Sequence, residues 1–112
     1  MKAEIRVIRD VTILDCSGKI TLGEETMMLR NTVTDVLQKG ARKILFNLSG
    51  VTYIDSAGVG ELVRSYVTGQ NAGAQIKLLG LTGKLREVLV ITKIITIFEV
   101  FDNETAAVLS FA

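Results

Sequence analysis

The apolar residues of the chain change their spacing several times, from short continuous runs that suit strands to the three- and four-residue spacing of helices. β-Branched residues dominate residues 5–8 and 11–16, and the polar pair Arg9 and Asp10 separates the two runs. This pattern predicts a hairpin of two strands, with residues 17–19 closing the second strand.

Helical spacing follows the hairpin. Thr21 and Glu24 form the T-x-x-E pattern of a capping box, which predicts a helix over residues 22–39 that stops at Gly40. The apolar positions of this helix are Leu29, Val33, Val36 and Leu37.

The middle of the chain continues with a strand and a second helix. Residues 43–48 form a nearly continuous apolar run, which is typical of a central strand covered on both faces. We expect residues 49–56 to form a loop and a helix to follow it, ending near residues 71–73. The predicted apolar stripe of that helix contains Val59, Leu62, Val63, Tyr66 and Val67.

The last third repeats the alternation. Residues 75–79 predict a strand, Thr82 caps a third helix, and residues 96–101 predict a final strand. Asp102 or Asn103 then caps a C-terminal helix that runs through Leu109. The inward side chains of the third helix are Leu85, Val88 and Leu89. The order β-β-α-β-α-β-α-β-α predicts one α/β domain over residues 1–112, with helices packed against a mixed central sheet.

Composition agrees with a single globular domain, because 48% of the 112 residues are hydrophobic and 22% are charged. The 13 Lys and Arg against 12 Asp and Glu predict no basic surface, so direct nucleic-acid binding is not expected. The first ten residues have no apolar signal core. The most apolar stretch, residues 88–98, contains Lys93 and is far shorter than the roughly 20 residues of a membrane helix. We therefore expect neither secretion nor membrane insertion.

The residue types that are missing restrict the chemistry. The chain has no histidine and one cysteine, which excludes a Ser-His-Asp triad, a histidine metal site and a thiolate zinc site. We expect no cofactor and no metal. Cys16 is interpreted as a small core residue on a strand, and a single cysteine fits the reducing cytoplasm.

Asp55 and Ser56 stand where a strand changes to a helix, and two interpretations are open. Either residue could cap the helix, or Ser56 could be an exposed functional hydroxyl. Gly58 disfavours a helix, as does Gly60, which suggests that the backbone there approaches the sheet or another protein closely. The same alternatives apply to Thr21, which is expected at the same end of the sheet as a cap or a partner contact.

The helical spacing also predicts which side chains of this region face outward. With the apolar stripe turned toward the core, the residues left for a partner are Ala57, Gly58, Glu61 and Arg64.

The chain resembles the STAS domain of bacterial anti-sigma factor antagonists over essentially its whole length. The most specific match is the pattern L-x-x-V-x-x-I-D-S-x-G-[VL]-G at residues 48–60, and the segment LTGKLREVLVITKI at residues 81–94 supports it. In that family the serine after the aspartate is phosphorylated by an anti-sigma factor that is itself a serine kinase. The resemblance implies that Ser56 is this residue, with Ala57 where many members have a second serine and Thr21 where many have an aspartate.

The resemblance further implies partner switching without catalysis. The unphosphorylated protein binds the anti-sigma kinase and frees a sigma factor, phosphorylation reverses this, and a serine phosphatase restores the active form. The expected partner-binding residues are Thr21, Asp55, Ser56, Ala57, Gly58 and Glu61. The protein is expected to be a monomer or a weak dimer.

Two alternatives belong to other classes. A STAS scaffold or sensor module that is never phosphorylated could bind a nucleotide, a lipid or another protein. A small hydrolase could use Ser56 as its nucleophile, although the sequence offers no base.

Overall fold

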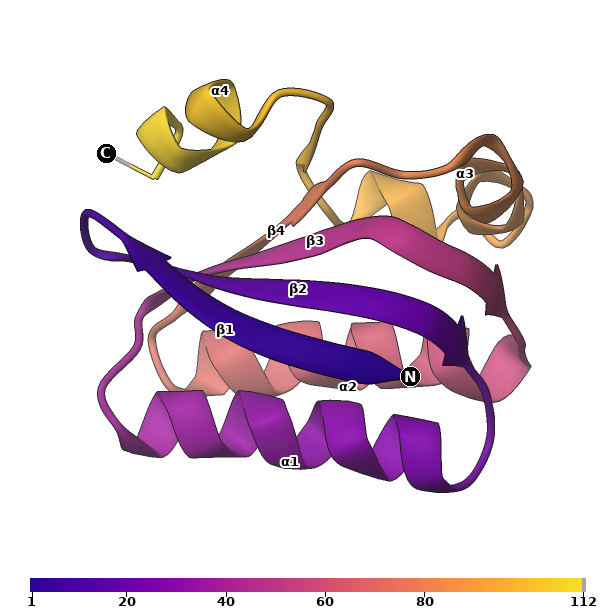
Figure 1. The fold of residues 1–112 in the computed structure, drawn as a ribbon, viewed down its shortest axis with the longest axis horizontal. Coiled ribbons are helices and arrows are strands. Elements are labelled where there is room, and N and C mark those ends of the chain that lie inside the picture. Colours follow the sequence, from indigo (N-terminus) through magenta and orange to yellow (C-terminus); the bar gives the residue numbers. More distant parts are fainter. Residues whose placement is uncertain (112) are drawn as a thin grey trace.

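The computed structural model describes residues 1–111, and in them five strands form one sheet in the order β1-β2-β3-β4-β5. β1 pairs antiparallel with β2, as the predicted hairpin requires, and the other pairs are parallel (Figure 1). The strands are β1 (Lys2–Ile8), β2 (Val11–Ile20), β3 (Lys43–Ile54), β4 (Gln75–Leu79) and β5 (Val100–Phe101).

The helices lie on both faces of this sheet. In the described residues they are α1 (Glu24–Gln38), α2 (Ser56–Asn71), α3 (Gly83–Ile91) and α4 (Glu104–Leu109), with a short 3₁₀ turn at Ile94–Thr96. Figure 1 shows α1 and α2 side by side across one face and α4 over the other. The predicted fold class and element order are therefore confirmed.

Alternation along the strands produces two apolar layers, because successive side chains point to opposite faces. On β2, Leu14 and Cys16 enter the larger core with Leu29 and Leu62 of the helices. The opposite face carries a smaller core beneath α4, formed by Val11, Ile13, Leu45, Leu79, Ala107, Val108 and Phe111.

Two strands are longer than predicted. β2 continues through residues 17–19 to Ile20, and β3 continues through the expected loop to Ile54. The two extensions pair in parallel, from Ser17 opposite Gly50 to Ile20 opposite Ile54, with register shifts that absorb the irregular residues. Because the two segments pair with each other, their backbone N–H and C=O groups are satisfied. The turn-forming residues in both segments predict loops and do not indicate this pairing.

The predicted capping box of Thr21 and Glu24 does not form, so this prediction is wrong. α1 begins at Glu24 after Gly23, which has a φ of 112°, and no side chain caps this helix. The positive φ at Gly23 places the helix start at Glu24, two residues later than predicted. The predicted strand at residues 96–101 is reduced to Val100 and Phe101.

Two other predicted caps are confirmed. The N–H of Leu85 donates to Oγ1 of Thr82 over 3.3 Å, and the N–H of Ala106 donates to Oδ1 of Asn103 over 2.9 Å. These caps start α3 and α4 where the sequence placed them.

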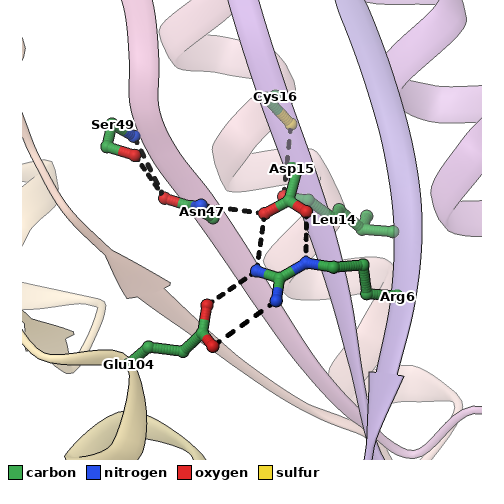
Figure 2. A network of polar contacts seen from close by, with 7 residues as sticks. All are labelled: Arg6, Leu14, Asp15, Cys16, Asn47, Ser49 and Glu104. Atoms are coloured by element: carbon green, nitrogen blue, oxygen red, sulfur yellow. Dashed lines mark hydrogen bonds and ion pairs between the residues drawn. The ribbon is translucent and has the colours of Figure 1, made fainter.

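A polar network fastens α4 to the sheet (Figure 2). The Arg6 guanidinium on β1 donates to Asp15 on β2 over 2.5 and 3.0 Å and to Glu104 on α4 over 2.6 and 3.4 Å. Asn47 on β3 donates to Asp15 over 2.8 Å. The network thus joins three strands and a helix that are far apart in sequence.

Among residues 1–111, no helix combines the length and the apolar character that a membrane crossing requires. The same residues contain no group of three or more Cys, Asp or Glu arranged to hold a metal ion.

Candidate functional site

The junction between β3 and α2 carries the candidate site, and Asp55 is its cap. Asp55 has extended backbone angles, and its Oδ1 accepts the N–H of Gly58 over 2.8 Å. Its Oδ2 accepts the N–H of Leu22 over 3.0 Å. These backbone hydrogen bonds, from Leu22 first and Gly58 second, lower the pKa of the Asp55 carboxyl.

Ser56 is the first residue of α2, and its side chain is exposed. Because Asp55 supplies the cap, the Ser56 hydroxyl is not needed for it. The side chain instead stands at a helix N-terminus, where free N–H groups and the helix dipole favour negative charge. Its neighbour Ala57 is half-buried.

The two glycines of the first turns have different surroundings. A Cβ on Gly58 would lie 2.2 Å from the Ile20 carbonyl oxygen and 2.6 Å from Cγ1 of Ile54, whereas a Cβ on Gly60 would meet nothing within 4 Å. Gly58 is buried, so the expectation that it faces outward is wrong. It is the residue that brings α2 close to its own sheet.

Glu61 also points inward, contrary to the prediction. Its side chain is only 2% exposed and accepts three hydrogen bonds from Arg30 of α1, the shortest one 2.8 Å long. Arg64 approaches Glu61 at 3.9 Å and is exposed. Val67, predicted to be inward, is exposed. The buried face of α2 is therefore rotated relative to the predicted apolar stripe, because α2 packs against α1 as well as against the sheet.

Cys16 is buried, as expected, and burial raises its thiol pKa to about 12. At neutral pH the thiol is protonated and unreactive, which confirms its interpretation as a core residue.

An open groove of about 810 Å³ lies beside Ser56, between α2 and α3. Its lining is mostly apolar, and we call it the α2–α3 groove. The lining residues are Tyr53, Ile54, Asp55, Ser56, Val59, Gly60, Val63, Val88, Thr92 and Ile94. The sequence did not indicate this surface, because the α3 residues reach it only through the tertiary fold.

The loop of residues 21–23, between β2 and α1, lies beside Asp55 through the hydrogen bond of Leu22. Thr21 is half-buried there, and Leu22 is 77% exposed. The structure thus brings Thr21 and Ser56 to the same end of the sheet, as predicted, through the bond between Leu22 and Asp55. Leu22 itself was not predicted, since no local pattern signals a contact between two loops.

This arrangement suits binding and modification. An exposed hydroxyl at a helix N-terminus can carry a phosphate, and the apolar surface around it can receive a protein. The chain contains no histidine that could activate Ser56 as a nucleophile.

Comparisons with known proteins agree with this description. The family model described as STAS domain matches residues 2–107. A Thermotoga neapolitana homologue of TM1081, provisionally named an anti-sigma factor antagonist, is 26% identical over 102 residues, covering 91% of this chain and 90% of that protein.

Solved structures show the same fold. The Thermotoga maritima protein TM1081, also provisionally named an anti-sigma factor antagonist, has a TM-score of 0.88 at 27% identity and covers 96% of this chain and 92% of its own. The Bacillus cell fate determinant SpoIIAA, in its phosphorylated form, has a TM-score of 0.76 at 17% identity, covering 99% of this chain and 100% of its own.

Proposed function

Because the chain belongs to the STAS domain family, we propose that it is an anti-sigma factor antagonist controlled by phosphorylation of Ser56. The observation that carries the proposal is the division of roles at the start of α2, where Asp55 caps the helix and Ser56 stays exposed. A kinase can modify Ser56 without removing the cap.

The phosphate would change the surface more than the fold. It adds about 1.5 to 2 negative charges, which the N-terminus of α2 tolerates because its N–H groups and dipole favour anions. A partner that receives a neutral hydroxyl would instead have to bury an unpaired charge, at a cost of several kcal/mol. The neighbouring Asp55 carboxylate adds to the negative charge that the partner would have to accommodate.

The proposed partner is an anti-sigma factor that is also a serine kinase. Binding would use Ser56, Ala57 and Thr21 together with the α2–α3 groove, while Asp55 orders this surface and the buried Gly58 and Glu61 support it from beneath. The names of TM1081 and its homologue support an anti-sigma factor as the partner, and the phosphorylated SpoIIAA is a protein of this fold that carries a phosphate.

In the proposed cycle, the unphosphorylated protein binds the anti-sigma kinase and thereby frees a sigma factor. Phosphorylation of Ser56 ends the binding, and a serine phosphatase restores it. The protein acts by binding rather than by catalysis, and such partners place it in the cytoplasm.

The first experiment locates the phosphate. The protein is incubated with a candidate anti-sigma serine kinase and ATP, and modified peptides are identified by mass spectrometry. We expect phosphate on Ser56 of the wild type and none in Ser56→Ala. The control variant Ser49→Ala, which removes another exposed serine on β3, should be modified normally. If the kinase is active on another substrate and leaves Ser56 unmodified, Ser56 has no switching role and bound small ligands become the next question.

The charge argument predicts how two Ser56 variants bind. Ser56→Asp should keep the circular dichroism spectrum of the wild type and lose about a hundredfold in affinity for the kinase. Ser56→Ala should bind the kinase and resist phosphorylation. Equal affinity of the wild type and Ser56→Asp, measured by calorimetry, would contradict the proposed switch.

A further inference from the structure

The Asp55 carboxylate is shared between two parts of the chain. Oδ1 accepts the N–H of Gly58 inside α2, which is the helix cap. Oδ2 accepts the N–H of Leu22, which lies on the loop of residues 21–23 before α1. Only the first bond is needed to start a helix, so the second has to be explained by what it does to the loop.

The loop of residues 21–23 has little else to fix it at its centre. Gly23 has a φ of 112°, and no side chain caps α1. Thr26 donates to the Gly23 carbonyl over 3.0 Å, which anchors only the end of the loop. The backbone N–H of Asp55 donates to the Ile20 carbonyl over 3.3 Å and anchors its beginning. The Asp55 side chain is therefore what holds the middle of the loop to α2.

The residue held in this way is apolar and faces solvent. The Leu22 side chain is 77% exposed on the loop before α1, and Leu22 does not line the α2–α3 groove. A large apolar side chain on a backbone held beside a binding surface has the character of an interface anchor, because its burial favours association and the backbone that carries it is already ordered.

We propose that Asp55 is a positioning residue, and that its bond to the Leu22 N–H holds Leu22 in place as an apolar anchor for the anti-sigma factor. The anchor half of this inference rests on the proposed function. The partner then needs an apolar pocket for Leu22 beside the position that receives the Ser56 hydroxyl. Affinity depends on Asp55 through Leu22 rather than through a direct contact of the carboxylate.

The variant Asp55→Asn separates the two bonds. Asparagine caps helices as well as aspartate does, but the two N–H groups bind different carboxylate oxygens, and the NH₂ group that replaces the oxygen facing Leu22 cannot accept a hydrogen bond. We expect amide hydrogen exchange of Leu22, measured by NMR on the protein alone, to become about tenfold faster in Asp55→Asn while Gly58 stays protected. Unchanged exchange at Leu22 would overturn the positioning role, whatever the partner does.

A double-mutant cycle tests the anchor with the serine kinase that phosphorylates Ser56. Leu22→Ser and Asp55→Asn should each weaken binding by about tenfold or more, and the double variant should lose little beyond the larger single effect, because both changes remove the same contact. Leu109→Ser, a matched exposed leucine on α4, should bind as the wild type does.

The other outcomes separate the two proposals. Wild-type affinity of Leu22→Ser, or additive losses in the double variant, would overturn the anchor while leaving Ser56 phosphorylation in place. A wild-type protein that fails to bind the kinase would overturn the proposed function and the anchor together, and the exchange experiment would still decide the positioning role.

Discussion

At the scale of single residues, the start of α2 distributes its tasks among neighbours that look interchangeable in sequence. Asp55 caps α2 and joins it to the loop of residues 21–23, the Ser56 side chain remains exposed, and Gly58 allows α2 to contact the sheet. The prediction from sequence that backbone closeness is needed at the two glycines is correct for Gly58, where the close surface is the protein's own sheet. Gly60 has open space around it and borders the groove.

Gly58 and Gly60 provide a matched pair of alanine substitutions. Gly58→Ala places a methyl group 2.2 Å from the Ile20 carbonyl oxygen and should destabilise the protein by about 1–3 kcal/mol or more. Gly60→Ala adds a methyl group in open space and should stabilise the helix by roughly 0.4–1 kcal/mol. Urea unfolding measures both. A stable Gly58→Ala would show that α2 can move away from the sheet at little cost.

At the scale of elements, α1 and α2 are joined by an ion pair as well as by apolar packing. The Glu61 side chain is buried between the two helices and its main partner is Arg30, which is itself partly exposed. A buried carboxylate requires its hydrogen bonds, so the pair fixes how α2 is rotated against α1. That rotation determines which residues of α2 face outward beside Ser56.

Substitution of Arg30 should therefore lower the free energy of unfolding more than substitution of the exposed Arg64. Arg30→Met leaves the Glu61 carboxylate without its 2.8 Å partner and should lower the free energy of unfolding by about 1–3 kcal/mol. Arg64→Met removes only the 3.9 Å contact and should change it by less than about 0.5 kcal/mol. Chemical unfolding of both variants gives the comparison, and equal effects would mean that the ion pair does not orient the helices.

At the scale of the whole molecule, two carboxylates connect distant parts of the chain. Asp15 joins β1 and β3 through Arg6 and Asn47, and Arg6 extends the network to α4 (Figure 2). Asp55 joins the loop before α1 to the start of α2. The Arg6 hydrogen bond is the main cause that lowers the pKa of Asp15, and backbone N–H groups lower that of Asp55.

These lowered pKa values predict the direction of acid unfolding. A carboxyl whose pKa is lower in the folded state stabilises that state above its unfolded pKa of about 3.9, and this contribution is lost as the pH falls through the folded pKa. The free energy of unfolding should therefore fall below about pH 4. In Asp15→Asn and Asp55→Asn the decline should be shallower, which unfolding curves between neutral and acid pH can measure. Curves parallel to the wild type would exclude these two groups as its cause.

Local sequence patterns were enough to predict the order of the elements, the mixed sheet, the cap at Thr82, a cap at Asp102 or Asn103, the buried Cys16 and the position of Ser56. These features depend on local spacing and on residue types that act within a few positions of each other. The extensions of β2 and β3, the start of α1, the inward Glu61 and the exposed Leu22 were decided only by the tertiary structure. The strand extensions, the inward Glu61 and the position of Leu22 depend on partners far away in the chain, such as Gly50 for Ser17, Arg30 for Glu61 and Asp55 for Leu22, whereas the start of α1 follows from the positive φ of Gly23. Hydrogen bonds and burial between distant segments leave no periodic signal in the sequence, because the partner is chosen by the fold.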